Sequence, residues 1–262
     1  MTSPGILALD FDGVLCDGLV EYFQTAWQAY CQLFSPAEAT PTEDLAERFY
    51  PLRPVIETGW EMPILLHALR EGIEDAAVHD HWSAIVQDVL QDTQIEPATA
   101  MAAVDGARDR WIQSDLEGWL SLHRFYPGVI EQLQEVIAAG IFPIIISTKE
   151  GRFIAALLHQ AGVELPSEQI IGKEIEHPKT TTLLDIQQSP PREANAAQPI
   201  WFIEDRLKTL EKVKGDSRLA PVQLFLADWG YNTAADRQIA EQDSRIHLLS
   251  LAQFTAGFEQ WM

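Results

Sequence analysis

Six short apolar runs constrain the fold of this chain more than any other feature of its sequence. They occupy residues 5–9, 142–146, 169–172, 200–203, 222–227 and 246–249. Segments with helical or loop patterns separate the last five runs from one another. Strands that are apolar throughout, with helices between them, are typical of a parallel sheet covered on both faces. We therefore predict an α/β core with a doubly wound, Rossmann-like parallel sheet, in which residues 5–9 form the first strand.

The stretch between the first two runs has a different pattern, which predicts helices and no convincing strand. Apolar residues recur at helical spacing in the segments 19–33, 43–49, 63–70, 81–90 and 98–120. The pattern changes at Tyr126, after which helices and apolar runs alternate. We therefore predict an α/β core domain formed by residues 1–17 and 124–262, with an α-helical domain of residues 18–123 inserted into it.

The composition argues against large anionic partners. Of the 262 residues, 39 are acidic and 18 are basic, which leaves a formal charge of −21. A surface that binds nucleic acid or anionic lipid needs lysines and arginines that neutralise phosphates. We expect neither partner, and a small ligand fits better. An anionic ligand would need local compensation by a metal ion, a lysine or a helix N-terminus.

Cysteine content and hydropathy bear on the compartment. The chain has 2 cysteines, Cys16 and Cys31, which are too few for a disulfide framework. The N-terminus has no basic region before its short apolar run, and no apolar stretch reaches the ~18 residues of a membrane span. We expect a protein of the cytoplasm or of a plastid-like stroma. The sequence does not predict an oligomeric state.

Polar residues follow four of the apolar runs, at the positions where parallel sheets bind their ligands. Ligands of open α/β sheets bind outside the carboxyl ends of the strands. The four groups are Asp10 and Asp12, then Ser147, Thr148 and Lys149, then Lys179, and last Glu204 and Asp205. An acidic residue at a strand end can also cap the next turn or helix. Four groups with complementary chemistry favour a shared site over four separate caps.

These residues resemble the haloacid dehalogenase superfamily of Mg²⁺-dependent phosphohydrolases. The resemblance is carried by DFDGV at 10–14, the apolar run that ends IIIST at 144–148, HPKTTTL at 177–183 and WFIEDRLKTL at 201–210. The sequence FYPGV at 125–129 is similar to the return from cap to core in this family. The match covers the core, whereas residues 18–123 match a family cap only in position and helical character.

The resemblance implies a role for each carboxylate of the first motif. Phosphoryl transfer from a monoester needs a nucleophile, charge neutralisation and an acid for the leaving oxygen. Asp10 would be the nucleophile and would form an aspartyl-phosphate. Asp12 would protonate the leaving group and later deprotonate the attacking water. Gly13 would allow the backbone to approach the phosphate closely, and Ser147 would donate its hydroxyl to the phosphoryl oxygens.

The same resemblance implies a magnesium site. Mg²⁺ prefers hard oxygen ligands, and the implied set is Asp10, the backbone carbonyl of Asp12, and Asp205, with Glu204 as a further ligand or a neighbour of the ligands. The chain departs from the common GDxxxD form, because Glu204 replaces the glycine and Thr209 stands where the later acid often lies. A glutamate–aspartate pair also occurs in the beta-phosphoglucomutase-like branch.

Three lysines compete for the role of phosphate ligand. Lys179 is preferred, because the interval to Asp205 leaves room for one helix and one strand. Lys173 lies further from the family pattern, and Lys149 directly follows the hydroxyl motif and could contact substrate or solvent. Thr148 is a weaker substrate contact than Ser147. In the inserted domain, Arg53 could bind the remote anionic end of a substrate, or it could be an ordinary ion-paired arginine.

Together these expectations favour an enzyme over a binding protein. We expect a Mg²⁺-dependent phosphatase acting on small phosphorylated metabolites, of the sugar phosphate or phosphoglycolate type. A phosphomutase of the beta-phosphoglucomutase type is the first alternative, and a non-catalytic phosphometabolite-binding or scaffold protein is the second. A 2-haloacid dehalogenase fits less well, since members with that activity lack the second aspartate of the first motif.

Overall fold

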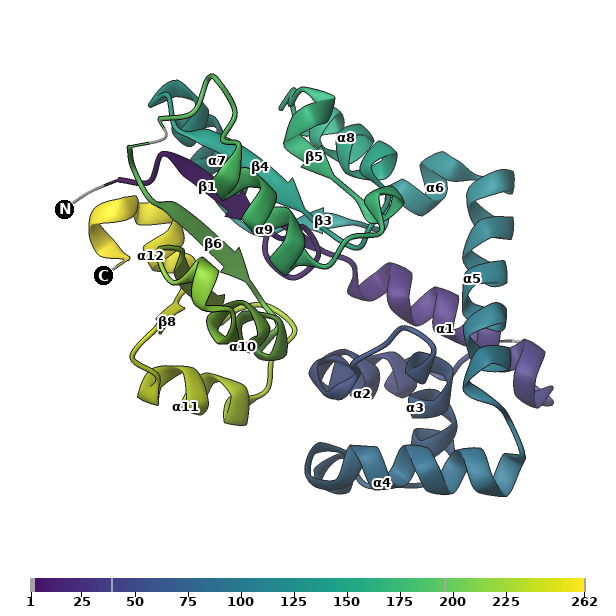
Figure 1. The fold of residues 1–262 in the computed structure, drawn as a ribbon. Coiled ribbons are helices and arrows are strands. Elements are labelled where there is room, and N and C mark those ends of the chain that lie inside the picture. The colour runs from purple at the N-terminus through teal and green to yellow at the C-terminus, as the bar shows by residue number, and fades with distance from the viewer. Residues whose placement is uncertain (1–2, 39, 196, 262) are drawn as a thin grey trace. The chain divides into compact units, whose positions relative to one another are not determined.

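The computed structural model describes residues 3–38, 40–195 and 197–261, and it divides into two compact units. One unit is formed by residues 1–17 and 124–262, and the other by residues 18–123 (Figure 1). We call them the α/β unit and the helical unit. That the helical unit serves as a cap remains a prediction.

The α/β unit contains a six-stranded parallel sheet and a small two-stranded ribbon. The strands of the large sheet are β1 (Ile6–Leu9), β4 (Phe142–Ile146), β5 (Ile170–Ile171), β6 (Ile200–Glu204), β7 (Gln223–Ala227) and β8 (Ile246–Leu249). The helices of this unit are α7 (Val129–Ala138), α8 (Gly151–Gln160), α9 (Lys179–Gln188), α10 (Leu207–Gly215), α11 (Ala234–Gln242) and α12 (Leu251–Ala256). The predicted doubly wound α/β fold is confirmed.

The strand order makes β1 the point where the winding direction of the sheet reverses. The order across the sheet is β5-β4-β1-β6-β7-β8, so the chain winds outward from β1 in both directions. β1 pairs in parallel with β4 on one side and with β6 on the other. The loops that follow these neighbours therefore lead away in opposite directions, and in open α/β sheets ligands bind at the carboxyl end of such a central strand.

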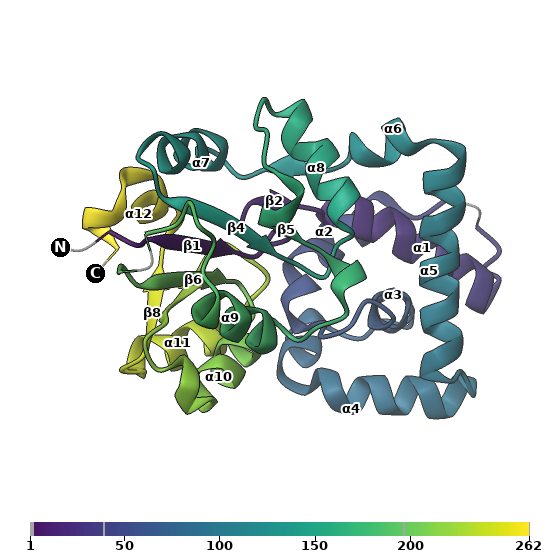
Figure 2. The ribbon, with the colours of Figure 1, turned by 45° about the horizontal axis from the view of Figure 1, so that its top comes forward.

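Helices cover both faces of this sheet, as the uninterrupted apolar strands require. On one face, apolar residues of α9, α10 and α11 pack against strand residues such as Ala8, Ile144 and Phe202, all of them buried. α7 and α12 lie on the other face (Figure 2). There, Trp201 and Phe225 contact the aromatic ring of Trp261 near the C-terminus. These two apolar layers position the strand ends that carry the polar residues.

The helical unit contains six helices among its described residues. They are α1 (Leu19–Phe34), α2 (Glu43–Leu52), α3 (Glu61–Arg70), α4 (Asp75–Thr93), α5 (Pro97–Ser114) and α6 (Leu116–Leu120). The single helical segment expected over 98–120 is two helices. Asp115 takes a non-helical conformation between them, and its carboxylate accepts a hydrogen bond from the backbone N–H of Gly118 at 2.9 Å, which begins the second helix.

The two-stranded ribbon was not expected from the sequence. It pairs β2 (Cys16–Asp17) with β3 (Arg124–Phe125) in antiparallel register, at the two points where the chain passes between the units. Strands of two residues are too short to produce a hydropathy pattern. Among the helices of the described ranges, none combines the length and hydropathy that crossing a membrane requires.

Candidate active site

Asp10 is the first residue after the central strand, and its carboxylate is held from two sides. Its Oδ1 accepts a hydrogen bond from the backbone N–H of Phe11 at 2.7 Å, and its Oδ2 lies 2.7 Å from the Nζ of Lys179. Burial raises the pKa of Asp10 to about 6, although the ammonium of Lys179 acts in the opposite direction. The expected nucleophile is thus a buried carboxylate with a fixed orientation.

Asp12 occupies a different environment from Asp10. Its Oδ1 lies 3.4 Å from the Nζ of Lys149, and its side chain is partly exposed. Gly13 follows with φ = 84°, a left-handed conformation that glycine adopts without strain. A Cβ atom at Gly13 would lie 2.1 Å from the Oδ2 of Asp205, so close approach also requires glycine here. The two aspartates therefore face different partners, with Lys179 beside Asp10 and Lys149 beside Asp12.

The residues after β4 differ in exposure. Ser147 is buried, and its hydroxyl accepts a hydrogen bond from the backbone N–H of Lys149 at 3.2 Å. Thr148 is exposed. The side chain of Lys149 is only 8% exposed and turns toward Asp12. Of this group, Lys149 contacts the first motif through Asp12.

Lys179 joins two strand ends. As the first residue of α9, it places its Nζ 2.7 Å from Asp10 and 2.7 Å from the Oε2 of Glu204. Burial by itself would lower the pKa of Lys179, but the two carboxylates outweigh burial, so the pKa is raised and the ammonium stays charged. Lys173, the other contender, is exposed in a short 3₁₀ turn.

Glu204 and Asp205 end β6 and are almost completely buried, each side chain being 1% exposed. The Oε1 of Glu204 accepts a hydrogen bond from the backbone N–H of Arg206 at 3.0 Å. Burial raises the pKa of both carboxyls, and the charge of Asp10 raises that of Asp205 further. Each of these acids is therefore harder to ionise in the metal-free protein than it would be in water.

The buried acids fit a divalent cation. Asp10, Glu204 and Asp205 each offer a carboxylate oxygen, and these oxygens all lie within 4.8 Å of one another. Lys179 contacts two of these carboxyls and the charge of Arg206 acts on Asp205, so three ionised carboxyls still outnumber the two positive charges near them. Hard oxygen donors with an uncompensated negative charge are the ligands that Mg²⁺ favours.

The sequence pattern did not identify two residues that contact this cluster. The backbone N–H of Tyr231 donates to the Oδ2 of Asp205 at 2.7 Å, and the Nδ2 of Asn232 donates to the backbone carbonyl of Asp205 at 3.0 Å. Both follow β7, the strand that pairs with β6. Their signal is the polar sequence after that apolar run, since ligand sites gather at strand ends.

Arg53 lies in the helical unit, just after α2. Its Nη1 donates to the backbone carbonyl of Ile56 at 3.1 Å, and its guanidinium lies 5.0 Å from the centre of the Tyr22 ring. Contact with substrate remains a prediction for this residue, as it does for Gly13, Thr148 and Lys149.

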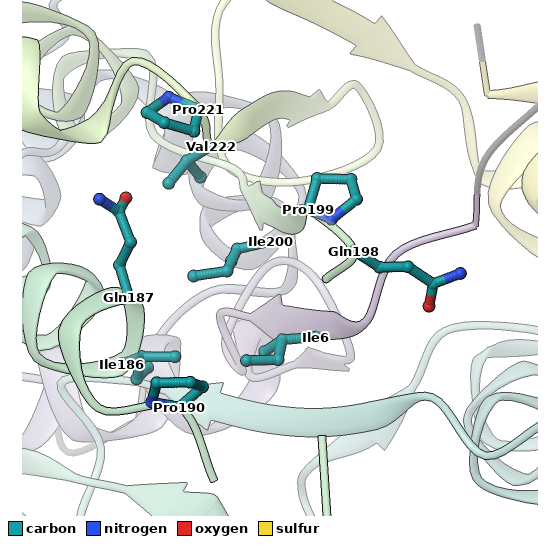
Figure 3. A pocket seen from close by; sticks show the side chains of 9 residues that line it. All are labelled: Ile6, Ile186, Gln187, Pro190, Gln198, Pro199, Ile200, Pro221 and Val222. Atoms are coloured by element: carbon teal, nitrogen blue, oxygen red, sulfur yellow. The ribbon is translucent and has the colours of Figure 1, made fainter. Parts of the chain in front are cut away.

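A separate cavity of about 190 Å³ lies at the opposite, amino end of the large sheet. Its walls are aliphatic, proline and glutamine side chains, namely Ile6, Ile186, Gln187, Pro190, Gln198, Pro199, Ile200, Pro221 and Val222 (Figure 3). None of these lining residues titrates or carries a charge. The cavity therefore offers no group for acid–base or metal chemistry, unlike the carboxyl end of the sheet.

Known structures with similar folds carry several descriptions. A hydrolase of the haloacid dehalogenase-like family from Streptococcus pneumoniae aligns with a TM-score of 0.52 at 15% identity, covering 96% of this chain and 95% of that chain. A predicted phosphatase from Clostridium acetobutylicum aligns at 0.54 and 13% identity, covering 97% of both chains. Protein Tyrosine Kinase A from Mycobacterium tuberculosis aligns at 0.54 and 13% identity, covering 98% and 96%.

No protein-family model matches the sequence, and no curated protein does. At identities this low the structural similarity establishes the fold alone. One of these similar structures is described as a kinase, so proteins with this fold can differ in activity. The chain therefore has the fold of the haloacid dehalogenase-like hydrolases, with a buried acidic cluster at the carboxyl end of its central strands.

Proposed function

We propose that this chain is a Mg²⁺-dependent phosphatase that hydrolyses small phosphorylated metabolites through an aspartyl-phosphate on Asp10. The observation that carries the proposal is the contact of one buried lysine, Lys179, with both Asp10 and Glu204, beside Asp205. In this proposal Asp10 is the nucleophile, Lys179 supplies a fixed positive charge, and the three neighbouring acids hold the metal.

In the first step, a carboxylate oxygen of Asp10 attacks phosphorus and the bond from phosphorus to the leaving oxygen breaks. Asp12 gives its proton to that oxygen as the bond breaks. Lys179 and the hydroxyl of Ser147 stabilise the negative charge on the transferred phosphoryl group. The products are the free alcohol and a phosphorylated Asp10.

In the second step, water attacks the phosphorylated Asp10 and the acyl–phosphate bond breaks. Asp12 accepts the proton of the attacking water, since it lost its own proton in the first step. Inorganic phosphate leaves, and both aspartates return to their starting forms. The proton balance closes over the two steps, because Asp12 loses one proton and gains one.

Asp10, the backbone of Asp12, Asp205 and Glu204 would hold the metal. When bound there, Mg²⁺ would neutralise phosphoryl charge. Gly13, Thr148 and Lys149 belong to the proposed substrate contacts in the α/β unit. In the helical unit, Arg53 would select substrates with a second anionic end. Sugar phosphates and phosphoglycolate are the substrate types that we propose.

A phosphomutase is the second candidate, on the strength of the Glu204–Asp205 pair. Both reactions begin with the same phosphorylated Asp10, and they differ in whether the phosphoryl group goes to water or back to a sugar phosphate. A non-catalytic binding protein is the third reading, in which the same residues would hold a phosphorylated ligand without turnover.

The test is a panel of phosphomonoesters incubated with Mg²⁺, followed by measurement of phosphate release and of sugar-phosphate isomers. Phosphate release that stops on metal chelation supports the phosphatase. Isomer conversion without net release would replace it by the mutase. Saturable binding with no turnover of any substrate would favour the binding protein.

A further inference from the structure

The loop after β7 contacts Asp205 through two consecutive residues. The backbone N–H of Tyr231 donates to the carboxylate of Asp205, and the amide of Asn232 donates to its backbone carbonyl, at 2.7 and 3.0 Å. Side chain and main chain of this acid are thus held from the same loop, residues 228–232. We call this segment the β7 loop.

The amide of Asn232 extends the pairing of two strands beyond their last regular partners. β6 and β7 pair as far as Glu204 and Leu226. The next residues along the two strands are Asp205 and Ala227, and the Nδ2 of Asn232 donates to both of their carbonyls, at 3.0 and 2.7 Å. One side-chain amide therefore joins the strands at their carboxyl ends.

Asn232 has little freedom to leave this position. It is 3% exposed, and both hydrogens of its amide group are used by the two carbonyls. Its Oδ1 and its backbone carbonyl each accept a hydrogen bond from the Nη1 of Arg237, at 3.0 Å. The side chain is therefore fixed on its donor and acceptor sides.

The glycine of the β7 loop shows how closely the loop packs against the acidic cluster. A Cβ atom at Gly230 would lie 2.3 Å from the Cβ of Asp205 and 2.4 Å from the backbone oxygen of Gly13. Gly13 in turn leaves room for the Oδ2 of Asp205. Asp205 is thus enclosed between two glycines, and only small backbone shifts are open to it.

We propose that Asn232 is a positioning residue for the metal site, acting through the backbone of Asp205. This inference rests on the metal site of the proposed function and concerns a residue that does not touch the metal or the substrate. The carboxylate oxygens of Asp10, Glu204 and Asp205 lie within 4.8 Å of one another, and like charges at this distance repel. Asn232 and Tyr231 hold Asp205 in place before a cation binds, and preorganised ligands bind metals more tightly.

A purely structural role for Asn232 predicts a different result. In that case its loss would lower the free energy of unfolding, and the folded fraction would bind Mg²⁺ as before. Thr233 provides the matched control. It is the next residue, and it caps α11 through a reciprocal pair of hydrogen bonds with Asp236. Its replacement by alanine removes this cap and destabilises the same region.

The experiment titrates metal-free protein with Mg²⁺ alone by calorimetry and measures unfolding by urea. We expect Asn232→Ala to weaken Mg²⁺ binding by about 10–100-fold, the effect typical of groups that orient metal ligands. Thr233→Ala should lose stability and keep its Mg²⁺ affinity within about twofold of the parent protein. An unchanged affinity in Asn232→Ala, or an equal loss in Thr233→Ala, overturns the inference.

A second variant separates the loss of positioning from a charge effect. Asn232→Asp keeps the shape and the acceptor for Arg237, but it removes both donors and adds a negative charge. Charge alone would strengthen Mg²⁺ binding, whereas loss of positioning weakens it. We expect weaker binding, and tighter binding would overturn the inference.

These measurements separate this inference from the proposed function. If the parent protein binds Mg²⁺ but hydrolyses no phosphomonoester, the proposed reaction fails while the positioning role of Asn232 is still decided by affinity. If the enzyme is active and Asn232→Ala keeps its affinity, the positioning role alone fails. A parent protein that binds no Mg²⁺ overturns both.

Discussion

Each of the two units buries acidic side chains, but these side chains have opposite kinds of neighbours in the two units. In the helical unit, Glu21 is 0% exposed and is surrounded by donors. Its carboxylate accepts hydrogen bonds from Thr25 at 2.7 Å, from Arg108 at 2.8 and 3.2 Å, and from the indole of Trp119 at 3.0 Å. In the α/β unit, Asp10, Glu204 and Asp205 lie against one another.

The neighbours of a buried acid indicate its role. Glu21 is a single charge with an arginine partner and two neutral donors. Its carboxylate therefore has the hydrogen-bond partners that a buried acid with a structural role needs. The acids of the α/β unit have one lysine among three carboxyls, and burial raises the pKa of each. Buried acids that repel one another in the ligand-free protein indicate a site that binds a cation.

The largest effect on activity should come from replacing Asp10, one of the three clustered acids. Asp10→Asn removes the attacking oxygen and one metal ligand, so we expect no measurable turnover at any pH and no phosphorylated enzyme. Mass spectrometry of acid-quenched protein, incubated with an aryl phosphate, checks this. An adduct on another residue of the variant would show that Asp10 is not the nucleophile.

Asp12→Asn tests the partly exposed neighbour of Asp10. The variant keeps the nucleophile but loses the proton donor and acceptor, which lowers turnover by about 10²–10⁴. The defect should shrink with better leaving groups, because an aryl oxide needs little protonation. The phosphoryl adduct should still be found on Asp10, and its absence would contradict the assigned role.

Asp205→Asn and Glu204→Gln sharpen the comparison within the crowded cluster. We expect the first to weaken Mg²⁺ binding and activity far more than the second, because we assign Asp205 the direct bond to the metal. The metal-free Asp205→Asn protein should be at least as stable toward urea as the parent, since the change removes a repelled charge. Equal losses of Mg²⁺ affinity, or a larger loss for Glu204→Gln, would reverse the assignment.

Glu21→Gln tests the satisfied acid of the helical unit. Removing one partner of a buried ion pair costs about 3–5 kcal/mol, and we expect the low end because the Arg108 side chain is 26% exposed. Urea unfolding measures the loss, with the exposed Asp88→Asn as a control that should change stability by less than about 0.5 kcal/mol. Mg²⁺ affinity should stay at the parent value, and a loss of affinity would contradict the contrast between the two clusters.

The smallest effect concerns pH and His67, which also lies in the helical unit. Its ring stacks on Phe34 at 4.3 Å, and burial lowers its pKa from the usual 6.5. The folded state therefore binds the proton less readily than the unfolded state, so stability is full above pH ~6.5 and falls as the pH drops below that value. The effect on stability should be small, because the His67 side chain is only partly buried.

Urea midpoints at pH 8 and pH 5.5 measure this dependence in the parent and in His67→Phe, which keeps a ring against Phe34. Other groups also titrate over this range, and their contribution is common to both proteins. The parent should lose more stability on acidification than the variant does. Identical losses would show that His67 does not contribute.

Much of the α/β unit could be predicted from residue patterns, because its signals are local. Uninterrupted apolar runs such as 142–146 and 200–203 identify buried parallel strands, and β4 and β6 occur where these runs lie. The polar residues at their ends follow from the same pattern. Asp115, in contrast, interrupts a segment whose apolar spacing looked continuous, because a single non-helical residue leaves that spacing nearly unchanged.

The candidate site divides in the same way. Asp10, Asp12 and the pair at 204–205 stand out in the sequence, since short motifs place them directly after strands. Asn232 does not, because its importance comes from a hydrogen bond to a residue 27 positions earlier in the chain. No local pattern of hydropathy or spacing records such a contact.

By itself, the sequence determined the α/β class, the identity of the acids at the strand ends and the preference for Lys179. Only the tertiary structure decided which acids repel one another and which are satisfied. Glu21 and Glu204 are the same residue type and are equally hidden from water, yet one has an arginine and an indole to itself while the other shares Lys179 with Asp10 in a cluster of carboxyls. The physical reason is that the charge state and purpose of a buried acid depend on its neighbours in space, and those neighbours come from distant parts of the chain.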